Sequence, residues 1–173
     1  MTVRGGGVEI NMVLHLPRDA VSVPICRQVL NGCLETLGVT PDTRADIALA
    51  LSEACANVVL HAGPGEEYEV QVSAKDRKCA IEVVNAGSLD SGPTPDGRRP
   101  AGEPIAGFPL TDQPVPATAE RGRGLRIIDA VTENLQLTGN QRYGTTVHFE
   151  KTLDWLPEAA GQHLLNGDDG ADH

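Results

Sequence analysis

The stretch that most constrains this chain is IALALSEACANVVL, residues 47–60. Almost every position is apolar or small, which predicts a helix packed into a core. Glu53 and Asn57 interrupt this pattern, and because they are four positions apart they share one helix face. Burying an unpaired carboxylate costs roughly several kcal/mol, so these side chains need partners or a function. The alternative is a surface pair on a helix that is less buried than its composition indicates.

Length, composition and charge limit the class of protein. A chain of 173 residues with 40% apolar and 22% charged residues is typical of one soluble globular domain. Aromatic residues make up only 3%, so the core must be built from Val, Ile, Leu and Ala. The net charge of −10 argues against nucleic-acid binding, because phosphates require a basic surface. No apolar run approaches the roughly 20 residues that span a membrane. The N-terminus lacks the apolar core of a signal peptide, so we expect a cytoplasmic protein.

Hydrophobic periodicity predicts five strands and three helices. The strands are expected at 8–16, 68–74, 79–85 and in a hairpin over 135–153. The helices are expected at 23–37, from about 40 to 62, and at 124–135. Because helices do not alternate strictly with strands, we predict an α+β two-layer sandwich, with helices on one face of a mostly antiparallel sheet.

The composition changes sharply over residues 87–119, which hold most of the prolines and show no sustained period. A segment of this kind inside a domain is usually functional or mobile. We therefore expect an N-terminal segment at 1–9, one domain at 10–155 and a disordered tail at 156–173.

Four scattered cysteines, none in a CxxC pair or beside a histidine, argue against a zinc site. They are Cys26, Cys33, Cys55 and Cys79. We expect them to be reduced and to pack as small apolar side chains. Cys26 and Cys33, seven apart on a predicted helix, could share a face, which leaves a redox switch as the alternative.

The polar pair on the long helix suits phosphoryl transfer. A carboxylate such as that of Glu53 can take a proton or orient a hydroxyl, and an amide oxygen such as that of Asn57 can bind Mg²⁺. Together they could build a site in which a cation shields phosphates while the carboxylate acts on the nucleophile.

Three shorter motifs add to this site. Asn85-Ala86-Gly87 ends an apolar strand and suits base recognition, although an ordinary turn is the alternative. Arg121 and Arg123 flank a glycine just before the third predicted helix, where backbone N–H groups would bind an anion. The GTT sequence at 144–146 offers two hydroxyls, or simply a turn into a strand.

In this order, the four motifs resemble the ATP-binding domain shared by gyrase, histidine kinases and MutL, a fold of the Bergerat type. Within that superfamily the chain is similar to the anti-sigma factor serine/threonine kinases. The matching segments are Ser52-Glu53-Ala54-Cys55-Ala56-Asn57 with His61-Ala62, Asn85-Ala86-Gly87, Gly122-Arg123-Gly124-Leu125 and Gly144-Thr145-Thr146-Val147. The resemblance covers roughly residues 10–152.

The resemblance implies a role for each motif. Asn57 would coordinate the Mg²⁺ that bridges the phosphates of ATP, and Glu53 would be the general base toward a Ser or Thr hydroxyl on a protein. Residues 88–119 would form the ATP lid. The residues expected to contact the nucleotide are Asn57, Asn85, Gly87, Arg121 or Arg123, Gly122, Gly124, Leu125, and Thr145 or Thr146.

Two positions depart from the family pattern. The family usually has Asp where this chain has Asn85, which can still accept a hydrogen bond from adenine but carries no charge. The family also tends to have a glycine where this chain has Leu89, so the hinging of the lid could differ. Neither departure affects Glu53 or Asn57.

The resemblance implies a cytoplasmic anti-sigma factor that sequesters a sigma factor and phosphorylates a STAS-type anti-anti-sigma antagonist, working as a homodimer. The alternative is a binding module of the same fold and partners, with weak or no nucleotide binding, which Asn85 would favour. A fragment of a sensor histidine kinase is a weaker hypothesis, since no pair of dimerisation helices precedes the domain.

Overall fold

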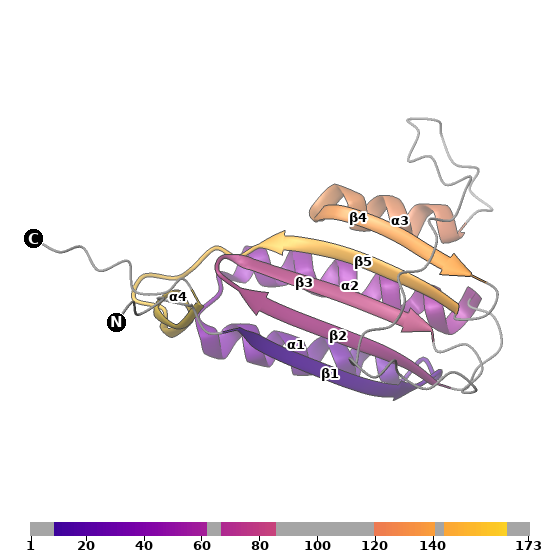
Figure 1. Ribbon diagram of the computed structural model, residues 1–173, viewed down its shortest axis with the longest axis horizontal. Coiled ribbons are helices and arrows are strands. Elements are labelled where there is room, and N and C mark those ends of the chain that lie inside the picture. The colour runs from indigo at the N-terminus through magenta and orange to yellow at the C-terminus, as the bar shows by residue number, and fades with distance from the viewer. Residues whose placement is uncertain (1–8, 62–66, 86–119, 141–143, 166–173) are drawn as a thin grey trace, which may run out of the picture.

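A five-stranded antiparallel sheet, covered on one face by helices, forms the body of the protein (Figure 1). The computed structural model describes residues 9–61, 67–85, 120–140 and 144–165. The strands are β1 (Ile10–Pro17), β2 (Glu67–Lys75), β3 (Lys78–Asn85), β4 (Glu133–Asn140) and β5 (Gly144–Thr152), in the order β1-β2-β3-β5-β4. The helices are α1 (Ser22–Leu37), α2 (Pro41–His61), α3 (Glu120–Val131) and α4 (Ala160–Leu165). The predicted α+β two-layer architecture is confirmed.

The helix-covered face of the sheet carries the core. Alternate residues of β2, β3 and β5 are apolar, and the strand register places them side by side. These buried rows are Val70–Val83–Val147 and Val72–Ile81–Phe149. The intervening residues point to the other face, which none of the helices in the described ranges covers. We name this the helix-free face and define it by the row Gln71–Glu82–His148–Gln136.

The ends of α1 and α2 follow from local chemistry. Gly38 ends α1 in the left-handed conformation, with φ of 84°, as its position after the apolar stripe predicts. Thr40 occupies the N-cap position of α2, and its carbonyl accepts the first intrahelical hydrogen bond from Arg44 N at 3.0 Å. Pro41 fills the first helical position, where a missing N–H costs nothing. The predicted end of this helix near residue 62 lies outside the described residues.

The predicted start of the third helix is wrong by four residues. Glycine lowers helix propensity by about 1 kcal/mol relative to alanine, so the sequence favoured a start no earlier than the second glycine, Gly124. Instead, α3 begins at Glu120 and includes both glycines. Packing explains the difference, because a Cβ added at Gly124 would lie 3.0 Å from Glu53 Oε2 on α2. The close approach of Glu53 therefore favours glycine at this position.

The predicted end of that helix at residue 135 is also wrong. The helix stops at Val131, and Thr132 N donates a last hydrogen bond to the carbonyl of Ile128 at 3.0 Å. Asn134 then adopts a left-handed φ of 51°, and the pairing of β4 with β5 shifts register between Glu133 and Gln136. This irregularity turns the chain from the helix directly into β4.

The expectation of a disordered tail from residue 156 is wrong up to residue 165. Leu165 is fully buried, and α4 packs against the end of α1. A Cβ at Gly161 would lie 2.4 Å from the Trp155 ring and 2.7 Å from the carbonyl of Leu37, so the contact is tight. Residues 1–8, the expected lid at 88–119 and residues 166–173 lie outside the described residues.

The cysteines behave mostly as packing residues. All four are free, and Cys26, Cys55 and Cys79 are buried. Burial raises the pKa of the Cys79 thiol to about 12, which keeps it protonated and unreactive. Cys26 is buried whereas Cys33 is exposed, so these two do not form the shared face that a redox switch between them would need. Among the described helices, none is long and apolar enough to cross a membrane.

Candidate functional site

The site is built around the polar stripe of α2. Glu53 and Asn57 are partly buried, and the helix face beside them carries the fully buried Ala54 and Val58. The helix is not buried all round, because Leu49 and Leu60 are exposed. Within the described ranges, neither the Glu53 carboxylate nor the Asn57 amide has a hydrogen-bond or ion-pair partner. A half-buried polar pair that has no partner in the described part of the chain is a candidate for ligand binding.

Helix α3 runs antiparallel to α2 across this stripe. Gly124 lies against Glu53, and the C-terminal carbonyl of α3, that of Val131, is tied to Asp46 through a lysine side chain described below. The two contacts are seven residues apart on each helix, in opposite chain directions. Continued by one turn, the same alignment brings the first turn of α3 level with Asn57. The unsatisfied N–H groups of that turn therefore lie at the same end of α2 as the amide.

Asn85 lies at the end of β3, on the face of the sheet that the helices cover. It follows the alternation of the buried Ile81 and Val83, pairs in register with Tyr68, and is only 1% exposed. Its Oδ1 is buried and has no hydrogen-bond partner among the described residues. Leaving a buried acceptor unsatisfied costs about 1–3 kcal/mol, which a donor on a bound ligand would recover. An exocyclic amine of a nucleotide base is such a donor.

The structure distinguishes among the other predicted contacts. Leu125 is buried in the core, so its side chain supports the helix, and Arg123 is exposed on the first turns of α3. Thr146 lies on the helix-free face, beside Val84, and so on the opposite side of the sheet from Asn85. The side chain of Thr145 lies outside what the structure describes.

Some predicted contacts lie at the edge of what is described. Arg121 and Gly122 belong to the helical backbone of α3, whereas Gly87 lies outside the described residues. Because α3 begins at Glu120, the predicted anion site shifts toward the N-terminus. The N–H groups that lack intrahelical acceptors belong to residues 120–123 rather than to the residues that follow Gly124.

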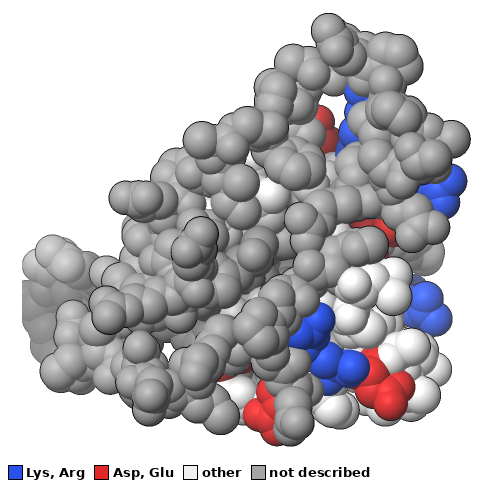
Figure 2. Space-filling view, turned by 90° about the vertical axis from the view of Figure 1, so that its right-hand side faces the viewer, with Lys and Arg blue, Asp and Glu red and all other residues white. Residues whose placement is uncertain are grey.

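Seen from the end that carries the site, the described surface shows cationic and anionic groups side by side rather than one basic patch (Figure 2). No cluster of three or more metal-ligating side chains occurs in the described ranges. A cation at Asn57 would therefore need ligands from a bound nucleotide and water, as Mg²⁺ commonly does.

Sequence reasoning missed Asp46 and Lys151, which lie 105 residues apart in the chain. The Lys151 ammonium lies 2.7 Å from Asp46 Oδ2 and 2.8 Å from the carbonyl oxygen of Val131, so it joins β5 to both α2 and α3. Asp46 is seven positions before Glu53 and shares its helix face, which was the one local signal available.

The family of histidine kinase-like ATPase domains matches residues 16–151 of the chain. The serine-protein kinase RsbW of Bacillus velezensis is 30% identical over 142 residues, which cover 82% of this chain and 84% of the relative. RsbW of Bacillus pumilus is 28% identical, over 82% of this chain and 85% of the relative. The RsbU and RsbW domains of Rv1364c from Mycobacterium tuberculosis have a similar fold, with a TM-score of 0.56 and 18% identity. That match covers 82% of this chain, which spans about a third (32%) of the longer one.

Proposed function

The chain belongs to the histidine kinase-like ATPase domain family and, within it, to the RsbW-type anti-sigma factor kinases, and from this premise we propose that it binds Mg-ATP between α2 and α3 and phosphorylates a protein on Ser or Thr. The observation that carries the proposal is the unsatisfied polar pair on α2. Glu53 and Asn57 are half-buried under α3 without partners among the described residues. Asn85 adds a buried acceptor with the same property.

The nucleotide would lie with its base at the end of β3 and its phosphates at the first turn of α3. Asn85 Oδ1 would accept a hydrogen bond from the adenine amine. The N–H groups of residues 120–123, with Arg121 or Arg123, would bind the phosphates. The Asn57 amide oxygen would be the protein ligand of Mg²⁺, which neutralises phosphate charge when bound. Residues 88–119 remain the proposed lid.

Glu53 would act as the general base. Its carboxylate lies one turn from Asn57 on the same helix face, so a hydroxyl beside the γ-phosphate would come within reach of both. Glu53 would hold the hydroxyl in line and take its proton as the phosphoryl group is transferred. The absence of a competing hydrogen bond within the described ranges leaves both carboxylate oxygens available.

The partners proposed for the chain follow from the family to which it belongs. We propose that it holds a sigma factor, phosphorylates a STAS-type anti-anti-sigma antagonist, and works in the cytoplasm as a homodimer. Direct nucleic-acid binding is not part of the proposal, because the net charge of −10 opposes it.

A second candidate is a partner-switching module of the same fold that needs no nucleotide. Asn85 favours it, since an uncharged side chain stands where the family usually has Asp. Glu53 and Asn57, both present and without partners in the described part of the chain, favour the kinase.

Calorimetric titration of the full chain with ATP, with and without Mg²⁺, separates these two functions. The kinase requires Mg²⁺-dependent binding that Asn57→Ala weakens by at least about tenfold. Asn11→Ala, an exposed asparagine on β1, serves as the matched control and should bind as the unmodified chain does. The absence of any ATP binding would overturn the kinase and support the nucleotide-independent module. Normal Mg-ATP binding by Asn57→Ala would show that the metal ligand is wrongly assigned.

A further inference from the structure

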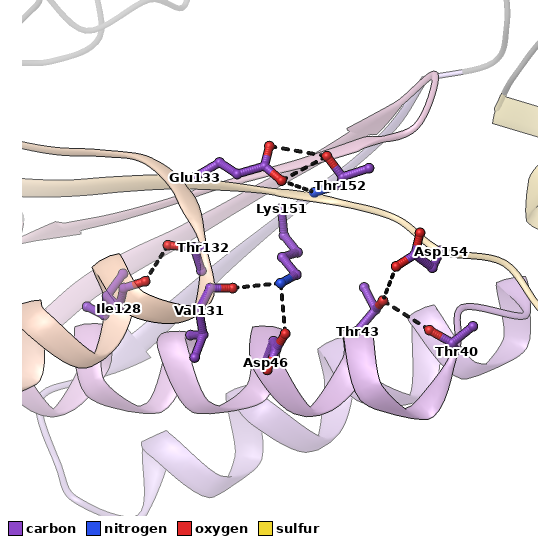
Figure 3. A network of polar contacts seen from close by, with 10 residues as sticks. All are labelled: Thr40, Thr43, Asp46, Ile128, Val131, Thr132, Glu133, Lys151, Thr152 and Asp154. Carbon is purple, nitrogen blue, oxygen red and sulfur yellow. Dashed lines mark hydrogen bonds and ion pairs between the residues drawn. The ribbon is translucent and has the colours of Figure 1, made fainter.

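A lysine on the sheet connects the two helices that form the site (Figure 3). Lys151 on β5 points between α2 and α3, where its ammonium donates to Asp46 Oδ2 at 2.7 Å and to the carbonyl oxygen of Val131 at 2.8 Å. The lysine side chain is 20% exposed and that of Asp46 is 40% exposed. A charged group with two good acceptors in a partly desolvated position forms a stronger link than a surface ion pair.

The lysine acts on the C-terminus of α3, a part of the helix that needs a cation. The last four carbonyls of a helix lack intrahelical donors and carry the negative end of the helix dipole. Val131 is the last residue of α3, and Lys151 supplies both the donor and the positive charge.

Two further contacts hold the end of α3 and the start of α2 against β5 and the residues that follow it. Just beyond the helix, Thr152 donates to the Glu133 carboxylate from its hydroxyl at 2.9 Å and from its backbone N–H at 3.3 Å. Thr43 near the start of α2 donates to Asp154 Oδ2 at 3.3 Å. The end of α3 and the start of α2 are thus both fastened to β5 and the residues that follow it (Figure 3).

This fastening lies on the same helix pair as the site. Asp46 precedes Glu53 by seven residues on α2, and Val131 follows Gly124 by seven residues on α3. Seven residues are two helical turns, or about 10 Å. Besides the packing of Leu125 and Ile128 in the core, helix α3 is therefore held on α2 by Lys151 at its C-terminal end and by the contact of Gly124 with Glu53 nearer its N-terminal end.

We propose that Lys151 is a positioning residue for the nucleotide site, and that with Asp46 it fixes how the first turn of α3 lies over Asn57. The inference rests on the proposed ATP site. Without the ammonium, the C-terminal end of α3 loses its polar link to α2, and the core packing of Leu125 and Ile128 with the Gly124 contact still leaves the helix able to tilt. A tilt moves the N–H groups that bind phosphate, but it leaves Asn85 and the base pocket at the end of β3 in place.

Lys151→Met tests this directly, with Lys78→Met as the matched control. Lys78 forms an ion pair of almost the same length, 2.8 Å to Glu150, but on the helix-free face, away from α2 and α3. We expect Lys151→Met to weaken Mg-ATP binding by about tenfold and adenosine binding by less than about twofold in calorimetry. Lys78→Met should leave both unchanged, and Lys151→Arg, which restores the charge and donors, should recover most of the Mg-ATP affinity. All titrations are made well below the unfolding temperature of each variant.

Two results would overturn the inference. One is unchanged Mg-ATP affinity in Lys151→Met. The other is an equal loss of Mg-ATP and adenosine affinity, which would indicate general destabilisation instead of positioning.

Failure of the proposed function gives a different result, since the unmodified chain would then not bind Mg-ATP at all. In that case hydrogen exchange of the α3 amides, measured without nucleotide, still tests the fastening. Faster exchange throughout α3 in Lys151→Met but not in Lys78→Met supports it, and equal exchange in the two variants overturns it.

Discussion

The polar side chains of the candidate site differ from those on the helix-free face of the sheet in whether they have hydrogen-bond partners. On the helix-covered side, Asn85, Glu53 and Asn57 are buried or half-buried and have no hydrogen-bond partners among the described residues. On the helix-free face, Glu82 and His148 are paired with each other and with their neighbours. Polar groups that satisfy one another stabilise a fold, whereas polar groups left unsatisfied next to a core indicate a binding site.

On the helix-free face, the charged side chains of this network are paired with one another. His148 Nδ1 lies 3.2 Å from Glu82 Oε1, and its Nε2 lies 3.4 Å from Glu150 Oε1. Glu150 also accepts from Lys78 at 2.8 Å and from the Asn134 amide at 2.9 Å. The hydrogen bond from Lys78 is the main reason that the pKa of Glu150 falls to about 2. Because these groups already have partners, we expect this face to contribute to stability and not to phosphoryl transfer.

The largest difference in activity should appear when one glutamate on each side of the sheet is replaced by glutamine. Glu53→Gln should lower phosphoryl transfer by at least about a hundredfold, because the proposed general base is lost, while Mg-ATP binding stays close to normal. Glu82→Gln, on the helix-free face, should transfer at the normal rate. Both rates are measured as transfer of labelled γ-phosphate to the STAS-type antagonist. Normal transfer by Glu53→Gln would remove this residue from the chemistry.

A second contrast uses two glycines that lie within helices. At Gly124 an added Cβ would meet Glu53 Oε2 at 3.0 Å, whereas at Gly32 in α1 it would meet nothing within 4 Å. Gly124→Ala should push α3 away from α2 and weaken Mg-ATP binding by about threefold to tenfold. Gly32→Ala should leave binding unchanged and raise the free energy of unfolding by about 0.5–1 kcal/mol, because alanine favours the helix. Equal nucleotide affinity in the two variants would show that the close approach of the helices is not needed for binding.

A smaller effect is expected where this chain departs from its family. Asn85→Asp should increase ATP affinity by about threefold, since a carboxylate accepts more strongly from the adenine amine. The same change should lower the thermal midpoint of the nucleotide-free protein, because it buries a charge that lacks a partner in the described part of the chain. Calorimetry and a thermal scan measure the two effects. A drop in ATP affinity instead would mean that Asn85 does not contact the adenine amine.

Local patterns predicted most of the fold and the placement of Glu53 and Asn57 on one helix face. The strands expected at 68–74 and 79–85 are observed at Glu67–Lys75 and Lys78–Asn85. Alternation of apolar side chains is a local property, so it can be read without knowing what each strand pairs with. The same holds for Glu53 and Asn57, since a spacing of four places them on one helix face.

Features that depend on distant contacts were not predicted. The first turn of α3 was predicted as a loop because helix propensity is a local property. The packing of Gly124 on α2 is not local, so the sequence did not show it. Helix α4 was missed because the burial of Leu165 depends on contacts with the end of α1. The link between Lys151 and Asp46 joins residues 105 positions apart, and no local pattern indicates such a pair.

The smallest predicted effect concerns pH and the helix-free face alone. The hydrogen bond with Glu82 raises the pKa of His148 above its ordinary value of 6.5, and the same bond lowers the pKa of Glu82. A raised histidine pKa adds stability that is fully present below about pH 6.5 and is lost as the pH rises through the folded value. The lowered carboxylate pKa values add stability that is present above about pH 4.5 and is lost at lower pH. Both contributions are therefore present together between about pH 4.5 and 6.5.

The loss of stability as the pH rises above about 6.5 reports the titration of His148. Because Glu82 is 43% exposed, solvent screening should keep the loss between pH 6 and 8 below about 1 kcal/mol. His148→Gln should flatten this part of the profile, since glutamine keeps a hydrogen bond but cannot gain a proton. Urea unfolding followed by the fluorescence of Trp155, the single tryptophan of the chain, measures the effect at each pH. The same decline in both proteins would assign the pH dependence to another group, and a change in Mg-ATP affinity would break the separation between the two faces.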